Sequence, residues 1–196
     1  MFRLGLTGSI ATGKSTVLEA FKDLGVPVYS ADAAVAELYA GEAVQAVETL
    51  FPGVAVDGVI DRQKLADRLR ANPSGFEKLE AVVHPLVRGR IGDFLASAEE
   101  AGYALAVVEV PLLYESGYDY GFDAVAVTHV EEAEQRRRAL ARPGMSGDKL
   151  DTMLARQMPQ AEKKGRADYL IDTGTSIAET RAAVAALVDS IRTGKD

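Results

Sequence analysis

Short apolar runs alternate along the chain with longer amphipathic stretches. The runs lack clean period-two alternation, which is typical of parallel strands covered by helices on both faces. They predict five strands, at 3–7, 26–29, 105–110, 124–128 and 169–171. Helical stretches fall between the strands, so the pattern indicates repeated βα units and a right-handed parallel sheet.

The clearest helix is the last one. Ser176 and Glu179 have the spacing of a capping box, in which each side chain bonds the backbone N–H of the other residue. One apolar stripe follows and predicts the buried face, namely Ile177, Val184, Leu187, Val188 and Ile191.

Two regions do not fit a minimal sheet. Residues 61–100 are helical in pattern, with an N-cap candidate at Asp61, and are too long for one crossover. Residues 136–164 are basic and polar, with a Pro143-Gly144 break and Pro159 closing a helix, as in a lid over a phosphate site. We therefore expect a nucleotide-binding core (1–60, 101–135 and 165–196), a helical acceptor-binding insertion (61–100) and a lid (136–164).

Composition narrows the function classes. The 196 residues are 47% hydrophobic and carry a net charge of −7, so a broad nucleic-acid surface is not expected. The absence of cysteine excludes disulfides, thiolate catalysis and cysteine-ligated metals, and two histidines exclude a histidine-rich metal site. The apolar run 104–113 is interrupted by Glu109 and Pro111 and is too short to span a bilayer. With no apolar leader either, we expect a soluble, cytoplasmic monomer with no membrane partner.

The strongest chemical motif is GSIATGKS, from Gly8 to Ser15. This Gly-x-x-x-x-Gly-Lys-Ser spacing lies between a predicted strand and a predicted helix, which is the context of a phosphate-binding loop. The alternative is a glycine-rich turn without a ligand. The motif tolerates Ser9 and Ala11 only if neither position requires a positive φ. The predicted ATP-binding residues here are Gly8, Ala11, Thr12, Gly13, Lys14, Ser15 and Thr16.

Asp32 follows the second predicted strand. Because the carboxyl ends of parallel strands line the ligand crevice, Asp32 could accept a proton from an attacking hydroxyl. Alternatively, Ser30 or Asp32 caps a helix that begins near Ala33. Position alone leaves both interpretations open.

Arg136, Arg137, Arg138 and Arg142 are predicted to lie on one helix, with positions 138 and 142 sharing a face. Such arginines could neutralise charge during phosphoryl transfer, or form a solvated face balancing nearby glutamates. We favour the solvated face for Arg136 and Arg137, and function for Arg138 and Arg142.

Three further residues could belong to a site. His84 precedes Pro85 within a helical pattern and either faces substrate or marks an exposed kink. Glu109 ends a predicted strand after the phosphate loop and could hold the water shell of Mg²⁺. Glu115 lies in the following loop and carries weaker evidence.

Taken together, these motifs resemble the dephospho-CoA kinase family over nearly the whole chain. They are LTGSIATGKST, VPVYSAD, IDR, His84-Pro85, VPLLYESG and ARQMPQAEKKGRADYLID, in that order. The resemblance implies an α/β fold: a P-loop, nucleoside-kinase-like three-layer core with a parallel sheet, a helical substrate-binding insertion and a lid. It also implies ATP as phosphoryl donor with Mg²⁺, and the ribose 3′-hydroxyl of dephospho-CoA as acceptor.

Matched to the family motifs, Asp32 corresponds to the general base, Lys14 and Ser15 to the ATP and Mg²⁺ residues, and Arg142 to the lid arginine. Arg62, His84 and Glu115 are assigned to acceptor binding, and Arg138 joins Lys14, Asp32 and Arg142 in the expected catalytic set. The sequence departs from the family at Ser9 and Ala11, where glycine is usual, and at Glu109, where aspartate is common. The PGMS segment after Arg142 also lacks the usual acidic residue.

The rival interpretations differ in acceptor or class. A nucleoside monophosphate-type kinase shares the core and lid, and only a substrate panel separates it. A regulatory GTPase needs an Asn-Lys-x-Asp motif, but the sole asparagine, Asn72, precedes Pro73. A non-catalytic nucleotide-binding module is disfavoured by Lys14, Ser15 and Asp32.

Overall fold

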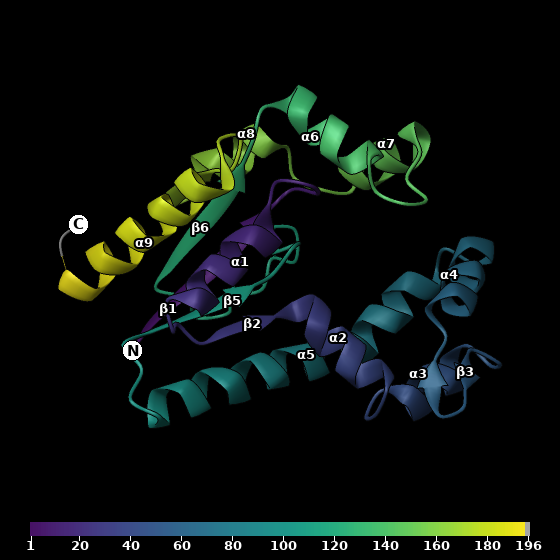
Figure 1. Ribbon diagram of the computed structural model, residues 1–196. Helices are drawn as coiled ribbons and strands as arrows, with labels where there is room; N and C mark the ends of the chain where they lie inside the picture. Colours follow the sequence, from purple (N-terminus) through teal and green to yellow (C-terminus); the bar gives the residue numbers. More distant parts are fainter. Residues whose placement is uncertain (195–196) are drawn as a thin grey trace. The chain divides into compact units, whose positions relative to one another are not determined.

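The computed structural model describes residues 1–194 and contains a five-stranded sheet in the order β2-β5-β1-β6-β7 (Figure 1). Strand β1 pairs in parallel with β5 and with β6, and β6 pairs in parallel with β7. All five predicted strands are confirmed with small shifts at their ends: β1 Phe2–Gly8, β2 Val28–Ser30, β5 Leu105–Glu109, β6 Ala124–His129 and β7 Tyr169–Asp172. The α/β prediction with a parallel sheet is therefore confirmed.

The chain divides into two compact units. The first comprises residues 1–29 and 95 onward and holds the sheet with α1 Lys14–Asp23, α6 Glu132–Leu140, α7 Gly147–Ala155, α8 Gln160–Gly165 and α9 Ile177–Thr193. The second unit, residues 30–94, holds α2 Ala31–Tyr39, α3 Val44–Leu50, β3 Ala55–Val56, β4 Val59–Ile60, α4 Arg62–Ala71 and most of α5 Gly75–Glu100. The helical pattern expected for 61–100 is present, but the compact unit that holds most of it spans residues 30–94.

The antiparallel hairpin β3–β4 was not predicted. It pairs Val56 with Val59 across Asp57 and Gly58, whose φ values are 50° and 80°. An Asp-Gly pair favours the left-handed conformation that tight hairpins require at both central positions. That dipeptide was therefore the available signal in the sequence.

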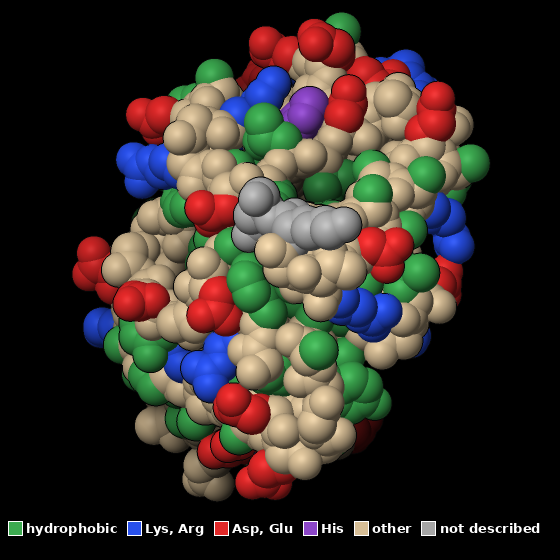
Figure 2. Space-filling model, turned by 90° about the vertical axis from the view of Figure 1, so that its left-hand side faces the viewer, with side chains coloured by type: hydrophobic (Ala, Val, Ile, Leu, Met, Phe, Trp, Pro, Cys, Tyr) green, Lys and Arg blue, Asp and Glu red, His purple; other side chains and the backbone are tan. Residues whose placement is uncertain are grey.

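The surface carries charge of both signs. Figure 2 shows acidic and basic side chains interspersed over one face of the molecule, without a broad basic patch on that face. No helix among the described residues is long and apolar enough to cross a membrane.

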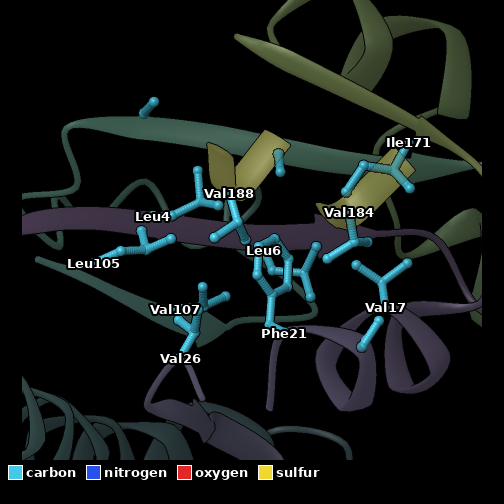
Figure 3. Packing of buried hydrophobic residues seen from close by; sticks show 13 residues of the cluster. Leu4, Leu6, Val17, Phe21, Val26, Leu105, Val107, Ile171, Val184 and Val188 are labelled. Atoms are coloured by element: carbon cyan, nitrogen blue, oxygen red, sulfur yellow. The ribbon is translucent and has the colours of Figure 1, made fainter. Parts of the chain in front are cut away.

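The main core lies where α1 and α9 pack against one face of the sheet. Figure 3 shows Val17 and Phe21 of α1 directed toward Leu6 of β1 and Val184 of α9. Phe21 and Leu6 are fully buried. Burying a side chain of this size contributes about 1.5–3 kcal/mol, so this packing holds β1, and the loop after it, in place.

The last helix differs from its prediction in one position. The capping box of Ser176 and Glu179 is confirmed, and Val184 and Val188 are buried. Ile177, however, is 65% exposed, and Thr180 is buried one turn later. As the first helical residue, Ile177 precedes the turn at which α9 reaches the core.

Candidate nucleotide-binding site

The GSIATGKS segment runs from the last residue of β1 into the first turn of α1, so the predicted strand–loop–helix context is confirmed. Helix α1 begins at Lys14, and its N-cap residue Gly13 has a φ of 82°. Among the described residues, no side chain caps this helix end. The first-turn N–H groups have no intrahelical acceptor, so they and the helix dipole favour an anion at this point.

Two glycines of the motif are required by space and conformation. Gly8 has a φ of 156°, and a Cβ there would lie 2.2 Å from Thr128 Oγ1 and 2.8 Å from the Thr128 carbonyl oxygen. A Cβ on Gly13 would lie 3.0 Å from the Thr173 side chain. The two threonines therefore enclose the backbone of the loop closely.

Internal donors occupy several carbonyl oxygens of the loop. Lys14 Nζ donates to the oxygens of Gly8 at 2.9 Å and Ser9 at 3.1 Å. Thr12 Oγ1 also donates to Ser9 O at 2.8 Å, and Thr173 Oγ1 donates to Thr12 O at 2.9 Å. Because these oxygens are engaged, the loop presents N–H groups rather than carbonyls to an anion.

Ala11 corrects the expectation about the loop. Its φ is 62°, so the condition that neither substituted position needs a positive φ is not met, although Ser9 is not among the described residues with positive φ. The left-handed conformation costs a residue with a Cβ about 1–2 kcal/mol. Ala11 is only 5% exposed and packs with Ile10 against Ala139 of α6 and Leu150 of α7. Burial of its methyl group offsets part of the strain.

Asp32 lies in the first turn of α2, as the second helical residue. The helix begins at Ala31 rather than near Ala33, and Ser30 is its N-cap residue without a side-chain capping hydrogen bond. Ser30 is thus the N-cap residue by position, without a side-chain cap, whereas the capping interpretation is wrong for Asp32. The Asp32 carboxylate is exposed at a helix N-terminus, where the dipole stabilises negative charge.

Arg62 and His84 lie in the same unit as Asp32. Arg62 is the first residue of α4, after Asp61, whose carboxylate caps the helix as predicted by accepting from Gln63 N at 2.9 Å and Lys64 N at 3.1 Å. The Arg62 guanidinium lies 5.8 Å from the centroid of the Tyr39 ring. Burial raises the pKa of Tyr39, and the charge of Arg62 opposes that rise. His84 is exposed on α5, which continues through the following proline.

Arg142 is not on the helix that carries the other arginines, which corrects that prediction. Helix α6 ends at Leu140. Arg142 directly precedes Pro143, and the proline ring disfavours the α conformation at the residue before it. The Arg142 side chain is exposed. Arg138, in contrast, donates from Nε to Glu134 Oε1 at 2.7 Å and from Nη2 to Thr173 O at 2.8 Å.

Glu134 is the common partner of two arginines. Arg137 bonds both of its carboxylate oxygens at 2.6 Å, and Arg138 bonds one of them. Hydrogen bonds from Arg137 and then Arg138 lower the pKa of Glu134 to about 2. Arg136 pairs with Asp151 of α7 at 2.7 Å. The interpretation of Arg136 and Arg137 as a solvated face that balances acidic residues agrees with these contacts.

Glu115 and Lys163 form a buried ion pair. Glu115 Oε1 accepts from Lys163 Nζ at 2.8 Å and from the Met158 backbone N–H at 2.8 Å. Its other oxygen, Oε2, is buried and has no hydrogen-bond partner among the described residues. Lys163 is fully buried and also donates to Pro111 O at 3.3 Å. The sequence did not single out Lys163 as a functional residue, although it lies within the family motif ARQMPQAEKKGRADYLID.

The segment that carries Lys163 also differs locally from its prediction. Pro159 does not close a helix, because it is the N-cap residue of α8. Helix α7 has already ended at Ala155. The fixed φ of proline and its lack of an N–H suit a helix start.

A magnesium ion would find a small donor set here. Glu109 ends β5 and is 6% exposed, next to Leu6 of β1 in the sheet register. Ser15 is exposed in the first turn of α1. Among the described residues, no group of three His, Cys, Asp or Glu side chains could hold a metal. One hydroxyl and one carboxylate fit a cation that is held mainly by phosphate and water oxygens.

Comparisons with known proteins agree with this geometry. The family model described as dephospho-CoA kinase matches residues 2–179. A dephospho-CoA kinase from Rhodopseudomonas palustris is 51% identical over 181 residues, which cover 92% of this chain and 91% of that protein. A solved Thermus thermophilus structure has a TM-score of 0.81 at 32% identity, covering 96% of this chain and 97% of that one. A dephospho-CoA kinase from Campylobacter jejuni has a TM-score of 0.73 at 25% identity, covering 99% and 98%.

Proposed function

The chain belongs to the dephospho-CoA kinase family, and we propose on that basis that it transfers the γ-phosphoryl group of ATP to the ribose 3′-hydroxyl of dephospho-CoA, forming coenzyme A. The observation that carries the proposal is the uncapped N-terminus of α1 behind GSIATGKS, in a chain that matches the family over nearly its whole length. Phosphoryl transfer depends mainly on positioning and charge neutralisation, and this site supplies both.

On the donor side, the N–H groups at the start of α1 would bind the β-phosphate. Lys14 would exchange its contacts with the Gly8 and Ser9 carbonyls for the β- and γ-phosphate oxygens, which carry full negative charge. Thr16 and Arg142 complete the proposed ATP set. The exposed Arg142 side chain would contact the transferred group, whereas Arg138 would first have to release Glu134 and Thr173. We propose residues 136–164 as the lid.

Ser15 and Glu109 are the proposed Mg²⁺ residues. Ser15 would contribute its hydroxyl directly, and Glu109 would accept hydrogen bonds from bound water. When bound, the cation supplies positive charge that neutralises the phosphate oxygens and orients them. The buried position of Glu109 suits this role, because a carboxylate at such a site is stabilised by nearby positive charge.

On the acceptor side, Asp32 is the proposed general base, which orients the 3′-hydroxyl and accepts its proton. Arg62, His84 and Glu115 are the proposed acceptor-binding residues. Arg62 would offer its guanidinium to the anionic phosphates of dephospho-CoA, because arginine pairs with phosphate oxygens through several N–H groups at once.

Small-molecule substrates, with no nucleic-acid or membrane partner, complete the proposal. We keep a monomer as the proposed state, and the cytoplasm, where ATP is supplied, as the proposed location.

The test follows the product directly. Purified protein, ATP and dephospho-CoA are mixed with Mg²⁺ and analysed by mass spectrometry, with AMP, CMP, shikimate and gluconate as parallel acceptors. A phosphate gain on dephospho-CoA alone supports the proposal. Gain on another acceptor instead would leave a kinase but reject dephospho-CoA as its acceptor.

Asp32→Asn tests the assignment of the base. We expect ATP binding to persist and kcat to fall about 10²–10⁴-fold, because a positioned general base contributes that factor. Asp93→Asn, an exposed carboxylate on α5, is the matched control. Turnover of Asp32→Asn close to that of the control would remove Asp32 as the base.

A further inference from the structure

Three glutamine side chains make hydrogen bonds that converge on Ile10 of the phosphate loop. The Val130 backbone N–H donates to Gln160 Oε1 at 2.9 Å, and Gln160 Nε2 donates to Gln135 Oε1 at 3.4 Å. Gln135 Nε2 then donates to the Ile10 carbonyl oxygen at 2.8 Å. Finally, the Ile10 N–H donates to Gln157 Oε1 at 3.0 Å.

The positions of the oxygen and the nitrogen in each glutamine side-chain amide follow from the backbone group that the amide contacts. An N–H can only donate, so Val130 and Ile10 each require an oxygen from Gln160 and Gln157. The Ile10 carbonyl can only accept, so it requires the NH₂ group of Gln135. The remaining Gln160–Gln135 contact then pairs an NH₂ group with an oxygen. Glutamine, which carries both a donor and an acceptor, satisfies all of these contacts.

Both polar groups of residue 10 therefore depend on side chains outside the loop. Ile10 is 6% exposed and Gln135 is 3% exposed, so water has little access to replace a lost partner. Inside the loop, the Lys14 ammonium and the Thr12 hydroxyl already bond the Gly8 and Ser9 carbonyls. Packing of Ile10 and Ala11 against Ala139 and Leu150 adds apolar contacts with α6, which also carries Gln135, and with α7.

We propose that Gln135, Gln157 and Gln160 are positioning residues for ATP: they hold the Ile10 peptide so that the following N–H groups are ordered for the phosphates before ATP binds. A loop that is already ordered loses less entropy on binding, so the effect is on ATP affinity. The inference rests on the proposed kinase function and deepens it. It also links the loop to residues 157–160, within the segment proposed as the lid.

The test compares apolar and acidic replacements at two positions. Gln157→Leu and Gln135→Leu each remove one buried hydrogen bond of the Ile10 peptide, and an ordinary bond of this kind corresponds to about a tenfold change in an equilibrium constant. We expect the Kd of a non-hydrolysable ATP analogue and the KM for ATP to rise about tenfold. The KM for dephospho-CoA should change by less than about twofold, because the acceptor does not bind this loop.

Acidic variants separate the chemical role from packing. In Gln157→Glu the carboxylate still accepts from Ile10, so slow hydrogen exchange of the Ile10 amide, followed by NMR, should persist. In Gln157→Leu that protection should be lost. Gln135→Glu has no NH₂ group and should weaken analogue binding as Gln135→Leu does. If the leucine variants fail to fold, the near-isosteric glutamate pair still provides the comparison.

Gln45→Leu and Gln45→Glu, on the exposed face of α3, are matched controls and should behave as wild type. Wild-type analogue affinity and wild-type Ile10 protection in both leucine variants would overturn the proposal. So would a loss of kcat with unchanged ATP affinity. Analogue binding and amide exchange need no turnover, so a chain that failed to phosphorylate dephospho-CoA would still give a clear answer on the glutamines.

Discussion

The buried pair of Lys163 and Glu115 gives a quantitative test of how the sheet-containing unit, residues 1–29 and 95 onward, is held together. Lys163 Nζ joins α8 to the loop after β5, because it bonds both Glu115 and Pro111 of that loop. Lys163→Met keeps much of the side-chain volume and removes the charge. The Glu115 carboxylate would then retain the Met158 N–H as its partner for Oε1, with Oε2 already lacking one among the described residues.

The expected loss is large because the remaining charge is buried. Removing one partner of a buried ion pair costs about 3–5 kcal/mol, whereas the intact pair adds little net stability over apolar replacements. For a chain of this size each kcal/mol lowers Tm by about 2–4 °C, so Lys163→Met should lower Tm by about 6–20 °C. The double variant Lys163→Met with Glu115→Gln should recover part of the loss, because no uncompensated carboxylate remains.

Urea denaturation followed by circular dichroism, together with calorimetry, measures both effects. Arg70→Met is the control, since Arg70 and Asp67 are 2.6 Å apart but 67% and 55% exposed, and an exposed pair contributes about 0–1 kcal/mol. A free energy of unfolding for Lys163→Met within about 0.5 kcal/mol of the control would refute the reasoning. So would a double variant whose loss relative to wild type equals the sum of the losses of the single variants Lys163→Met and Glu115→Gln, because the pair would then show no coupling.

Three further predictions concern stability. Ala11→Gly should stabilise the fold by relieving about 1–2 kcal/mol of backbone strain. It should also destabilise the fold by removing a buried methyl worth about 0.8 kcal/mol and by giving the unfolded chain freedom worth about 0.4–1 kcal/mol. Urea denaturation should therefore show a change within about 1 kcal/mol, and a loss above about 2 kcal/mol would contradict the strain argument. Hydrogen bonds from Arg137 lower the pKa of Glu134 from 4.5 to about 2, so the ionised Glu134 side chain stabilises the fold fully above pH 4.5 and loses this effect as pH falls through about 2. The difference in the free energy of unfolding between wild type and Glu134→Gln should shrink across that window, and a constant difference would argue against a role of the Glu134 charge in stability. Ser176→Ala removes the cap of α9 and should cost about 1 kcal/mol by urea denaturation, whereas no change would show that the capping box is not stabilising.

Local chemistry explains why much of this protein was predictable. The three central strands β1, β5 and β6 are short, mostly buried apolar runs, and their composition marks them without reference to any distant residue. The GSIATGKS loop is equally local, since its glycines, lysine and serine act within one strand–loop–helix unit. Caps at Asp61 and Ser176 depend on residues two or three positions away. The same local motifs, taken in order, identified the family.

Other features depend on contacts between distant segments. The left-handed conformation of Ala11 is offset by contacts with Ala139 and Leu150, which are far along the chain. Arg138 is engaged by Thr173, a residue that no helical periodicity connects to it.

The sequence by itself determined the five strands of the main sheet, the phosphate loop and the family, because these follow from neighbouring residues. Only the tertiary structure decided which polar side chains bury themselves to support that loop. In the sequence, Lys163 and the three glutamines look like ordinary residues of polar segments. Their roles appear only in the folded chain, where water is excluded and each buried polar group depends on the few partners within reach.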